Sequence, residues 1–405
     1  MKQGNRFEPG EKGQRVRALF SYGTFHFIDD GFADSIYLLL PFIAVELHLS
    51  FSEVGILKGV FSGAMGLCQL PLSLLGEKVG ELTVIASGTI GLAAGFLMLS
   101  LATTFPAFFV TLILAKGVAA GQHGLSSSVL SRVFEGPGRR AAMGTFNFSG
   151  DLGKVCLPFL LALLINLIGW RPAVFSLAIG GIILTAMFWA LARKSQAGST
   201  LLPAKQERVA GDSRWGIRDP KGFSALLTIG IIDISTRTAL LTFLPFLLLE
   251  KGIAAPQVGF ALTLLFAGGA AGKFGCGVLA EWFGVIPMVV VTEALTAAGI
   301  LSLFWAPLTS VWILLPLVGV VLNGTSSVLY ATVAEIISPA GRSRGYGLYY
   351  AITLGSGAVS PVIYGLVTDS LGLSFTIISI GLMVLITIPL SRFLSQPKPT
   401  EPAKA

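Results

Sequence analysis

The residues best suited to chemistry are ionisable side chains inside long apolar stretches. Near the N-terminus, His26, Asp30, Asp34 and Tyr37 recur at helical spacing on one face, with Asp29 on its flank. Carboxylates and imidazoles inside a membrane are costly unless they face a partner or water, so this face indicates an ion or substrate pathway. We expect Asp30, Asp34 and His26 to carry protons, because no lysine or arginine stands beside them in the sequence, and Asp29 and Tyr37 to contact substrate.

Other apolar stretches also contain charged residues. Asp151 and Lys154 form an i,i+3 pair, and Asp233 and Arg237 form an i,i+4 pair, so each of these acids has a cation on its own helix. Cations in such positions favour an anionic solute such as a phosphonate or carboxylate. We expect substrate to contact these four residues and also Lys116, His123, Asn147, Asn323 and Tyr330.

Each of these residues has a structural alternative. Interhelical salt bridges that fix packing explain Asp151 and Asp233 as readily as substrate binding does, and explain Asp30 less readily. A hydrogen-bonded core histidine is as good an interpretation of His26 or His123 as a ligand. Because no metal-ligand cluster, catalytic nucleophile or nucleotide-binding motif is present in the sequence, we predict no enzyme activity, no cofactor and no metal site.

The elements that must position these residues are membrane-spanning helices. Of the 405 residues, 53% are hydrophobic and 12% are charged, and the mean hydropathy is +0.79. Soluble globular proteins carry charge on about 25% of their residues. About 20 apolar residues cross a bilayer as a helix, so each of the uncharged stretches 82–115 and 294–334 holds two spans. The composition argues against a soluble enzyme, a disordered chain or a coiled coil, and predicts an all-α polytopic membrane protein.

The apolar stretches predict twelve helices in two sets of six. The helices are expected at 18–45, 52–75, 83–103, 106–131, 142–168, 172–192, 223–249, 257–280, 285–306, 310–334, 344–368 and 373–394. The polar segment between the sets is rich in basic residues. We therefore predict an N-terminal six-helix bundle at 1–192, a cytoplasmic linker at 193–222 and a C-terminal six-helix bundle at 223–405.

The basic residues concentrate on one side of the predicted helices. They lie in the N-terminal segment, the central linker, the C-terminal segment and alternate short loops, which the positive-inside rule places in the cytoplasm. We expect an integral protein of a bacterial inner membrane with both termini cytoplasmic. Basic loops near anionic lipid explain the net charge of +7 without a nucleic-acid partner. The expected partners are the lipid bilayer, a small-molecule substrate and protons, with the chain acting as a monomer.

The two halves of the chain resemble each other. An ungapped offset of 204 residues pairs acidic, proline and glycine residues, which apolar composition alone does not produce. The pairs include Asp29 with Asp233, Pro41 with Pro245, Glu77 with Glu281 and Gly80 with Gly284, and an offset of 203 pairs Arg139 with Arg342. Two parallel repeats joined by a long linker suit a transporter in which one bundle rocks against the other.

A loop motif adds a family resemblance. Leu75-Gly76-Glu77-Lys78-Val79-Gly80, and its counterpart at 277–284, resemble the loop between helices 2 and 3 of the major facilitator superfamily. The resemblance implies the major facilitator fold, twelve transmembrane helices in two pseudo-symmetric six-helix bundles, in which helices 1, 4, 7 and 10 line a central cavity. The acidic residue can pair across the bundle seam, and the glycine permits a sharp turn. We assign gating to Glu77, Lys78, Gly80, Arg139, Glu281, Gly284 and Arg342.

A finer resemblance involves the first five helices. His26 with Asp29-Asp30, the segment 123–127 and the segment 147–153 are similar to the fosmidomycin-resistance branch, which exports small drugs in exchange for protons. The implied function is proton-coupled efflux of a small anionic or zwitterionic compound by alternating access. Two alternatives stay open: an uptake symporter or uniporter for a small organic anion or metabolite, and a membrane scaffold or receptor that transports nothing.

Overall fold

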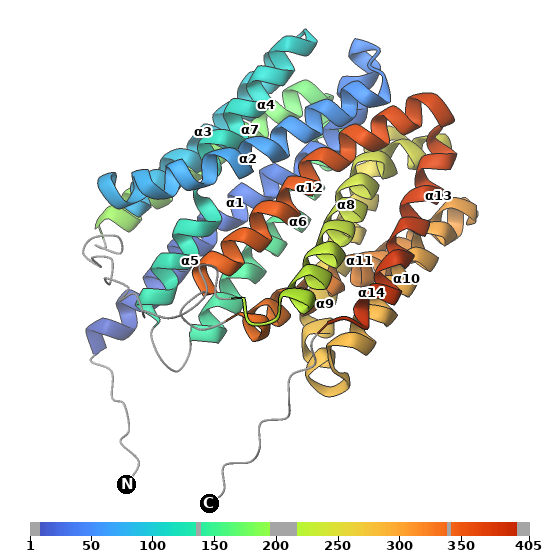
Figure 1. Cartoon of the computed structure of the whole chain (residues 1–405). Helices are drawn as coiled ribbons and strands as arrows, with labels where there is room; N and C mark the ends of the chain where they lie inside the picture. Colours follow the sequence, from blue (N-terminus) through green and yellow to red (C-terminus); the bar gives the residue numbers. More distant parts are fainter. Residues whose placement is uncertain (1–8, 135–138, 195–216, 338–341, 395–405) are drawn as a thin grey trace, which may run out of the picture. The chain divides into compact units, whose positions relative to one another are not determined.

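The structure, a computed structural model, describes residues 9–134, 139–194, 217–337 and 342–394. Most of the predicted linker 193–222 lies outside these ranges. The described residues are helical apart from short turns and one isolated antiparallel bridge between Ile217 and Ile337. Figure 1 shows the helices in chain order, from blue to red.

The helix bounds follow the predicted spans closely. The first set contains α1 (Pro9–Leu47), α2 (Phe51–Val79), α3 (Glu81–Leu101), α4 (Phe105–Ala119), α5 (Gln122–Val133), α6 (Arg139–Ile168) and α7 (Trp170–Lys194). The second set contains α8 (Pro220–Glu250), α9 (Ala255–Phe283), α10 (Val285–Trp305), α11 (Leu308–Ile336), α12 (Arg342–Leu371), α13 (Leu373–Met383), the 3₁₀ turn η2 (Val384–Ile386) and α14 (Thr387–Ser391).

The described chain contains eleven stretches that are long and apolar enough to cross a membrane. Two of them join adjacent elements: α4 with α5, and α13 with η2 and α14. The remaining predicted span is α1, which carries the acidic face identified in the sequence. Together these make the twelve helices that the sequence predicts.

The fourth predicted span, 106–131, contains a break that the sequence pattern did not predict. α4 ends at Ala119, and the Ala120 N–H bonds to the Gly117 carbonyl three residues back, in place of the α-helical bond. Gly117 and Gly121 flank the break, and glycine weakens a helix by up to about 1 kcal/mol relative to alanine. α5 then starts at Gln122, so His123 lies in its first turn.

Matching turns support the internal repeat. Gly80 precedes α3 with φ 95°, and Gly284 precedes α10 with φ 85°. Gly169 and Gly372, related by the 203-residue offset, likewise separate consecutive helices with φ 83° and 86°. Glycine adopts this left-handed backbone at little cost, whereas other residues are strained there. The sharp turns expected at Gly80 and Gly284 are therefore present.

The contacts divide the chain into two compact units. Unit 1 comprises residues 1–39 and 64–205, and unit 2 comprises residues 40–63 and 206–405. The start of α2 belongs to unit 2, where it lies against α12: a side chain at Gly55 or Gly59 would overlap backbone carbonyl oxygens of that helix. The Asp369 carboxylate of α12 also accepts hydrogen bonds from the Phe51 and Ser52 N–H groups, at 2.8 and 2.9 Å.

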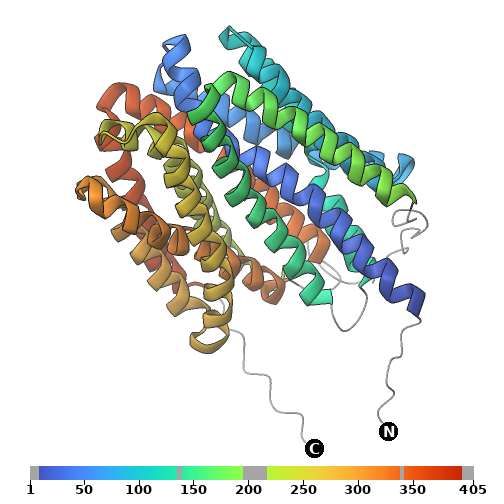
Figure 2. The ribbon, with the colours of Figure 1, turned by 180° about the vertical axis from the view of Figure 1, so that it is seen from behind.

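Within unit 1, glycines let α1 and α6 approach closely. A Cβ atom on Gly153 of α6 would overlap the Phe27 carbonyl oxygen of α1, and one on Gly31 of α1 would come within 2.8 Å of the Gly153 carbonyl oxygen. Figure 2 shows these two helices side by side. α3 packs against α4 and α7 on other faces of the unit. The close approach brings the acidic face of α1 against polar residues of α6.

Within unit 2, α9 and α11 pack in the same way. Side chains at Gly268 and Gly272 of α9 would overlap the carbonyl oxygens of Pro316 and Val320 in α11. The glycine cluster of α9 therefore serves close helix packing at these two positions. Gly275 differs, because no atom lies within 4 Å of the position its Cβ would take.

The two α9 glycines give a matched test of this packing. G272A should lower the free energy of unfolding by about 1–3 kcal/mol, because the α9 and α11 backbones must separate. G275A should leave stability unchanged or raise it by up to about 1 kcal/mol, since alanine favours the helix. Thermal unfolding of both purified variants measures the difference. Equal melting temperatures would contradict the packing.

Candidate functional site

The centre of the candidate site is a histidine–aspartate pair on α1. His26 Nε2 lies 3.2 Å from Asp30 Oδ2, one helical turn away, and both side chains are buried. The other ring nitrogen, Nδ1, lies 2.9 Å from the Phe146 carbonyl oxygen of α6. The His26 ring also stacks on the Phe146 ring, with centroids 4.2 Å apart. The ring is therefore fixed in place by contacts on both of its nitrogens and on one face.

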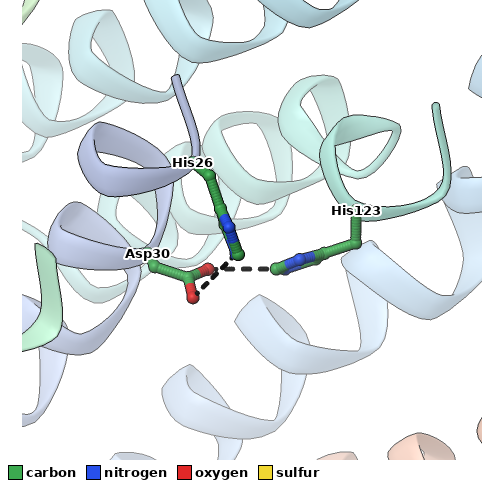
Figure 3. A group of neighbouring side chains, drawn as sticks. All are labelled: His26, Asp30 and His123. Carbon is green, nitrogen blue, oxygen red and sulfur yellow. Dashed lines mark ion pairs between the residues drawn. The ribbon is translucent and has the colours of Figure 1, made fainter. Parts of the chain in front are cut away.

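Asp30 connects this pair to two further helices. Its Oδ1 lies 3.4 Å from His123 Nε2 of α5, as Figure 3 shows. Its Oδ2 lies 3.1 Å from Lys154 Nζ of α6. The His26 and His123 rings meet edge to face at 5.0 Å. Residues far apart in sequence thus converge on one carboxylate.

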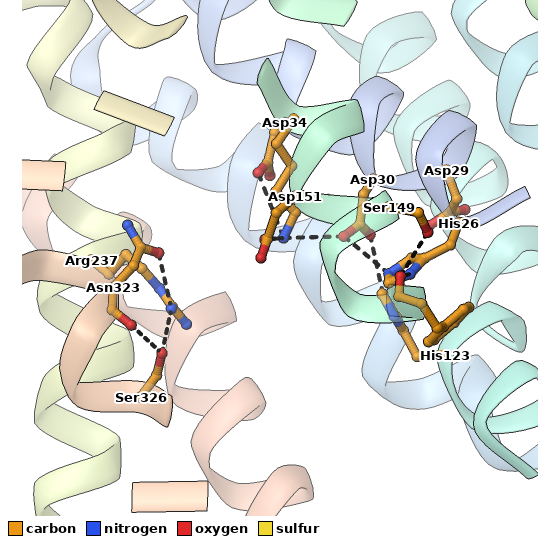
Figure 4. A network of polar contacts seen from close by, with 12 residues as sticks. His26, Asp29, Asp30, Asp34, His123, Ser149, Asp151, Arg237, Asn323 and Ser326 are labelled. Atoms are coloured by element: carbon orange, nitrogen blue, oxygen red, sulfur yellow. Dashed lines mark hydrogen bonds and ion pairs between the residues drawn. The ribbon is translucent and has the colours of Figure 1, made fainter. Parts of the chain in front are cut away.

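The position of Lys154 corrects one step of the sequence argument. The i,i+3 spacing predicted an ion pair between Lys154 and Asp151. Asp30 was expected to lack a cation, because no lysine or arginine is near it in the sequence. Lys154 Nζ lies closer to Asp30, at 3.1 Å, than to Asp151, at 3.8 Å, or Asp34, at 4.0 Å. Figure 4 shows the three acids, Asp30, Asp34 and Asp151. Sequence spacing missed the contact because it joins two helices.

Gly150 explains how the pair fits against α6. A Cβ atom there would lie 2.5 Å from His26 Nε2 and 2.8 Å from Asp30 Oδ2. Only a residue without a side chain leaves room for both groups at this point on α6. Gly150 was not identified from the sequence as a site residue, although it lies in the segment 147–153 that carries the family resemblance.

Asp29 forms a separate pair. The Lys116 ammonium of α4 donates to Asp29 Oδ2 at 2.8 Å, and both side chains are buried. The second oxygen, Asp29 Oδ1, has no hydrogen-bond partner. A buried pair of this kind holds α1 to α4. This structural role is the alternative to the predicted contact of both residues with substrate.

The hydrogen bonds locate a proton on His26. A carbonyl oxygen only accepts, so the contact with Phe146 requires a proton on Nδ1. A neutral ring would then leave Nε2 bare against the Asp30 carboxylate, which is also an acceptor. The 3.2 Å contact is favourable when Nε2 carries a proton as well, that is, when His26 is an imidazolium ion. The arrangement is therefore suited to holding a proton between His26 and Asp30.

The same donors are also spaced for a metal ion. One donor atom from each of His26, Asp30 and His123 lies within 4.8 Å of the others, and no other such group occurs in the described ranges. The sequence predicted no metal site. The Lys154 ammonium, however, lies 3.1 Å from the Asp30 oxygen that faces His26, and a cation there competes with a metal ion. We therefore treat the group as a proton site.

The other predicted residues of unit 1 lie at the edge of this network. Tyr37 is buried in the core, and Asn147 is exposed. Ser149, which the sequence argument did not select, donates to the Phe146 carbonyl oxygen at 2.6 Å and so shares that acceptor with His26.

Unit 2 contains its own polar group. Arg237 Nη1 of α8 lies 3.4 Å from Asn323 Oδ1 and 3.5 Å from Ser326 Oγ, both on α11, as Figure 4 shows. Ser326 was not selected from the sequence. Asp233 is buried near Arg237.

Aromatic contacts surround the last predicted residue of unit 2. The Tyr330 ring lies 6.1 Å from the Tyr349 ring and 5.2 Å from the Tyr350 ring, between α11 and α12.

The gating residues are only partly described. Lys78 and Glu281 are exposed, and Gly80 and Gly284 form the turns given above. The side chains of Glu77, Arg139 and Arg342 lie outside the described residues. Glu81, where the superfamily loop has a base, pairs with Arg132 of α5.

Comparison with known proteins identifies the family. The sequence model of the Major Facilitator Superfamily matches residues 19–232 and 226–405. The chain belongs to this superfamily. As a member of the Major Facilitator Superfamily it is an integral membrane protein and a secondary transporter, not an enzyme.

Relatives in the superfamily carry transporter names. The chain is 26% identical over 256 residues to a probable L-galactonate transporter of Escherichia coli, a match that covers 59% of this chain and only 56% of that one. It is 24% identical to the uncharacterized MFS-type transporter YfnC of Bacillus subtilis, over 91% of each chain. It is 23% identical to a probable 4-methylmuconolactone transporter of Cupriavidus pinatubonensis, over 83% and 80% of the two chains.

A solved structure has the same fold. A bacterial homolog of the human lysosomal transporter Spinster, in an inward-facing and occupied conformation, is 16% identical, with a TM-score of 0.79 over 96% of this chain and 97% of that one. The likeness establishes twelve transmembrane helices in two pseudo-symmetric bundles, as the sequence predicted.

The Asp29–Lys116 pair gives a stability prediction. K116M should lower the free energy of unfolding by about 3–5 kcal/mol, because it leaves a buried carboxylate without its cation. The double variant D29N/K116M should recover most of that loss, since neither charge remains. Unfolding of the purified proteins in denaturant measures both. Equal losses in the single and double variants would contradict the buried pair.

Proposed function

We propose that this superfamily member is a proton-coupled transporter of a small organic anion or zwitterion, with His26, Asp30 and Asp34 carrying the proton. The substrate class rests on two cations: Lys154, beside Asp30 in unit 1, and Arg237, near Asp233 in unit 2. The network around Asp30 contains ionisable groups that a passive pore has no need to bury.

The observation that carries this proposal is the pair of contacts on the His26 ring. Nδ1 faces an obligatory acceptor at 2.9 Å and Nε2 faces a carboxylate at 3.2 Å, so the ring is stable there when doubly protonated. If the ring gives up this proton, the Nε2 contact with Asp30 becomes unfavourable, which links the protonation state of His26 to the local arrangement of α1.

The charges of the network favour co-transport of proton and anion. Together, the network around Asp30 and the separate Asp29–Lys116 pair contain four carboxylates, those of Asp29, Asp30, Asp34 and Asp151, and two ammonium groups, those of Lys116 and Lys154. An anion that binds beside four carboxylates is repelled unless imidazoles nearby are protonated. A proton and an anion therefore support each other's binding. This favours a symporter for a small organic anion.

Export by exchange for protons is the second candidate. It rests on the similarity of 26–30, 123–127 and 147–153 to the fosmidomycin-resistance branch, in which proton and drug move in opposite directions. The names of two relatives, for L-galactonate and 4-methylmuconolactone, agree with a small organic solute in either case. For both candidates we place the monomer in a bacterial inner membrane, with cytoplasmic termini and linker, and assign gating to the turns at Gly80 and Gly284.

Substrate-driven proton flux tests the proposal. Wild-type protein in liposomes is given small carboxylates and phosphonates, including L-galactonate and 4-methylmuconolactone, while internal pH and solute are followed together. D30N should abolish proton flux, because the amide cannot hold the His26 imidazolium ion. H26Q should do the same. Both should retain residual solute movement that no longer responds to a pH gradient.

The same assay includes a control variant and gives the direction of transport. E250Q changes an exposed carboxyl group at the end of α8 and should leave coupling intact. Proton and solute that move in the same direction identify symport, and opposite directions identify exchange. Solute flux that never depends on pH in the wild type would refute the proposal.

A further inference from the structure

Unit 2 contains a buried acid, Glu293, that was not selected from the sequence. Glu293 is the one charged residue of α10 and is 1% exposed. Its Oε1 has no hydrogen-bond partner. An ionised carboxylate with an unsatisfied oxygen, far from water, is among the least stable groups a membrane protein can contain.

The charged neighbour that acts on Glu293 is another acid. Asp233 of α8 lies close enough to repel it electrostatically, and Asp233 is itself 4% exposed, with Oδ2 unpartnered. Arg237, the arginine of α8, acts on Asp233. One arginine can balance one carboxylate. The other acid of the pair is stable in this environment when it is protonated.

The remaining elements packed against α10 contain few charged residues. α13, η2 and α14 contain none. α9 contributes Lys273 and the exposed Glu281. α11 contributes Glu335, whose side chain lies outside the described residues.

The internal repeat shows that the fold does not need an acid here. The 204-residue offset places Thr89 of α3 at the position of Glu293, and Thr89 is buried and bonds its own helix at the Ile85 carbonyl. Asp233, by contrast, matches Asp29. Unit 2 therefore has an additional acid where unit 1 has a neutral residue.

We infer that Glu293 is a second proton-binding residue, which holds its proton where it is buried near Asp233. The inference rests on the proposed proton coupling for its role in transport, and it adds a proton site in unit 2 to the one at His26 and Asp30. The ligand is a proton; no metal or organic group is involved.

Infrared spectroscopy tests the protonated state without any transport assay. Wild-type protein at neutral pH should show the carbonyl stretch of a buried, protonated carboxylic acid, shifted on labelling with ¹³C-glutamate. E293Q should remove that band, whereas E250Q should retain it. E293T, which copies the repeat mate, serves if E293Q does not fold. A wild-type spectrum without the band, or a band that persists in E293Q, would overturn the inference.

The role in coupling has a separate measurement. In liposomes, the number of protons moved per substrate should fall in E293Q and stay unchanged in E250Q. An unchanged ratio in E293Q would show that the proton is structural and would overturn the transport role. If the band is lost in E293Q but the wild type moves no protons with substrate, the proton site stands and the proposed function fails.

Discussion

The structure depends on the cost of placing charge inside a bilayer. Every buried carboxylate needs a cation, a hydrogen-bond donor or a proton, because no water is available to stabilise it. Asp29 has Lys116, and Asp30 has Lys154 and two imidazoles. Glu293 has another acid and a threonine as neighbours. For a buried carboxylate without a cation beside it, protonation is the remaining way to avoid an uncompensated charge, and we propose that transport uses such a proton.

Close helix packing makes these contacts possible. Lys154 reaches Asp30 because Gly31 and Gly153 let α1 and α6 approach, and because Gly150 leaves space for the His26 ring. In unit 2, Gly268 and Gly272 have the same effect on α9 and α11. Van der Waals packing through small residues drives helix association in membranes, where water provides no hydrophobic force between helices. The glycines thus position the acids and bases without touching a substrate.

The sequence predicted the helices well and the contacts between them poorly. Long uncharged stretches determine the spans, and the sharp turns at Gly80 and Gly284 were expected from the loop motif. Lys154 was assigned to Asp151 because sequence spacing reports only neighbours on one helix. The contact between His26 and the Phe146 carbonyl oxygen could not be predicted, since every residue has a backbone carbonyl group. Glu293 could have been found: it is the one charge in the long apolar stretch 285–305.

The protonation state of His26 tests the central claim most directly. The chain has 3 histidines, so ¹⁵N NMR of histidine-labelled protein, with H48Q and H123Q for assignment, resolves the His26 ring. The account predicts that both ring nitrogens of His26 carry a proton at neutral pH in the wild type, and that D30N loses the proton at Nε2. A wild-type His26 that is neutral, with a proton at Nε2 alone and a bare Nδ1, would contradict it.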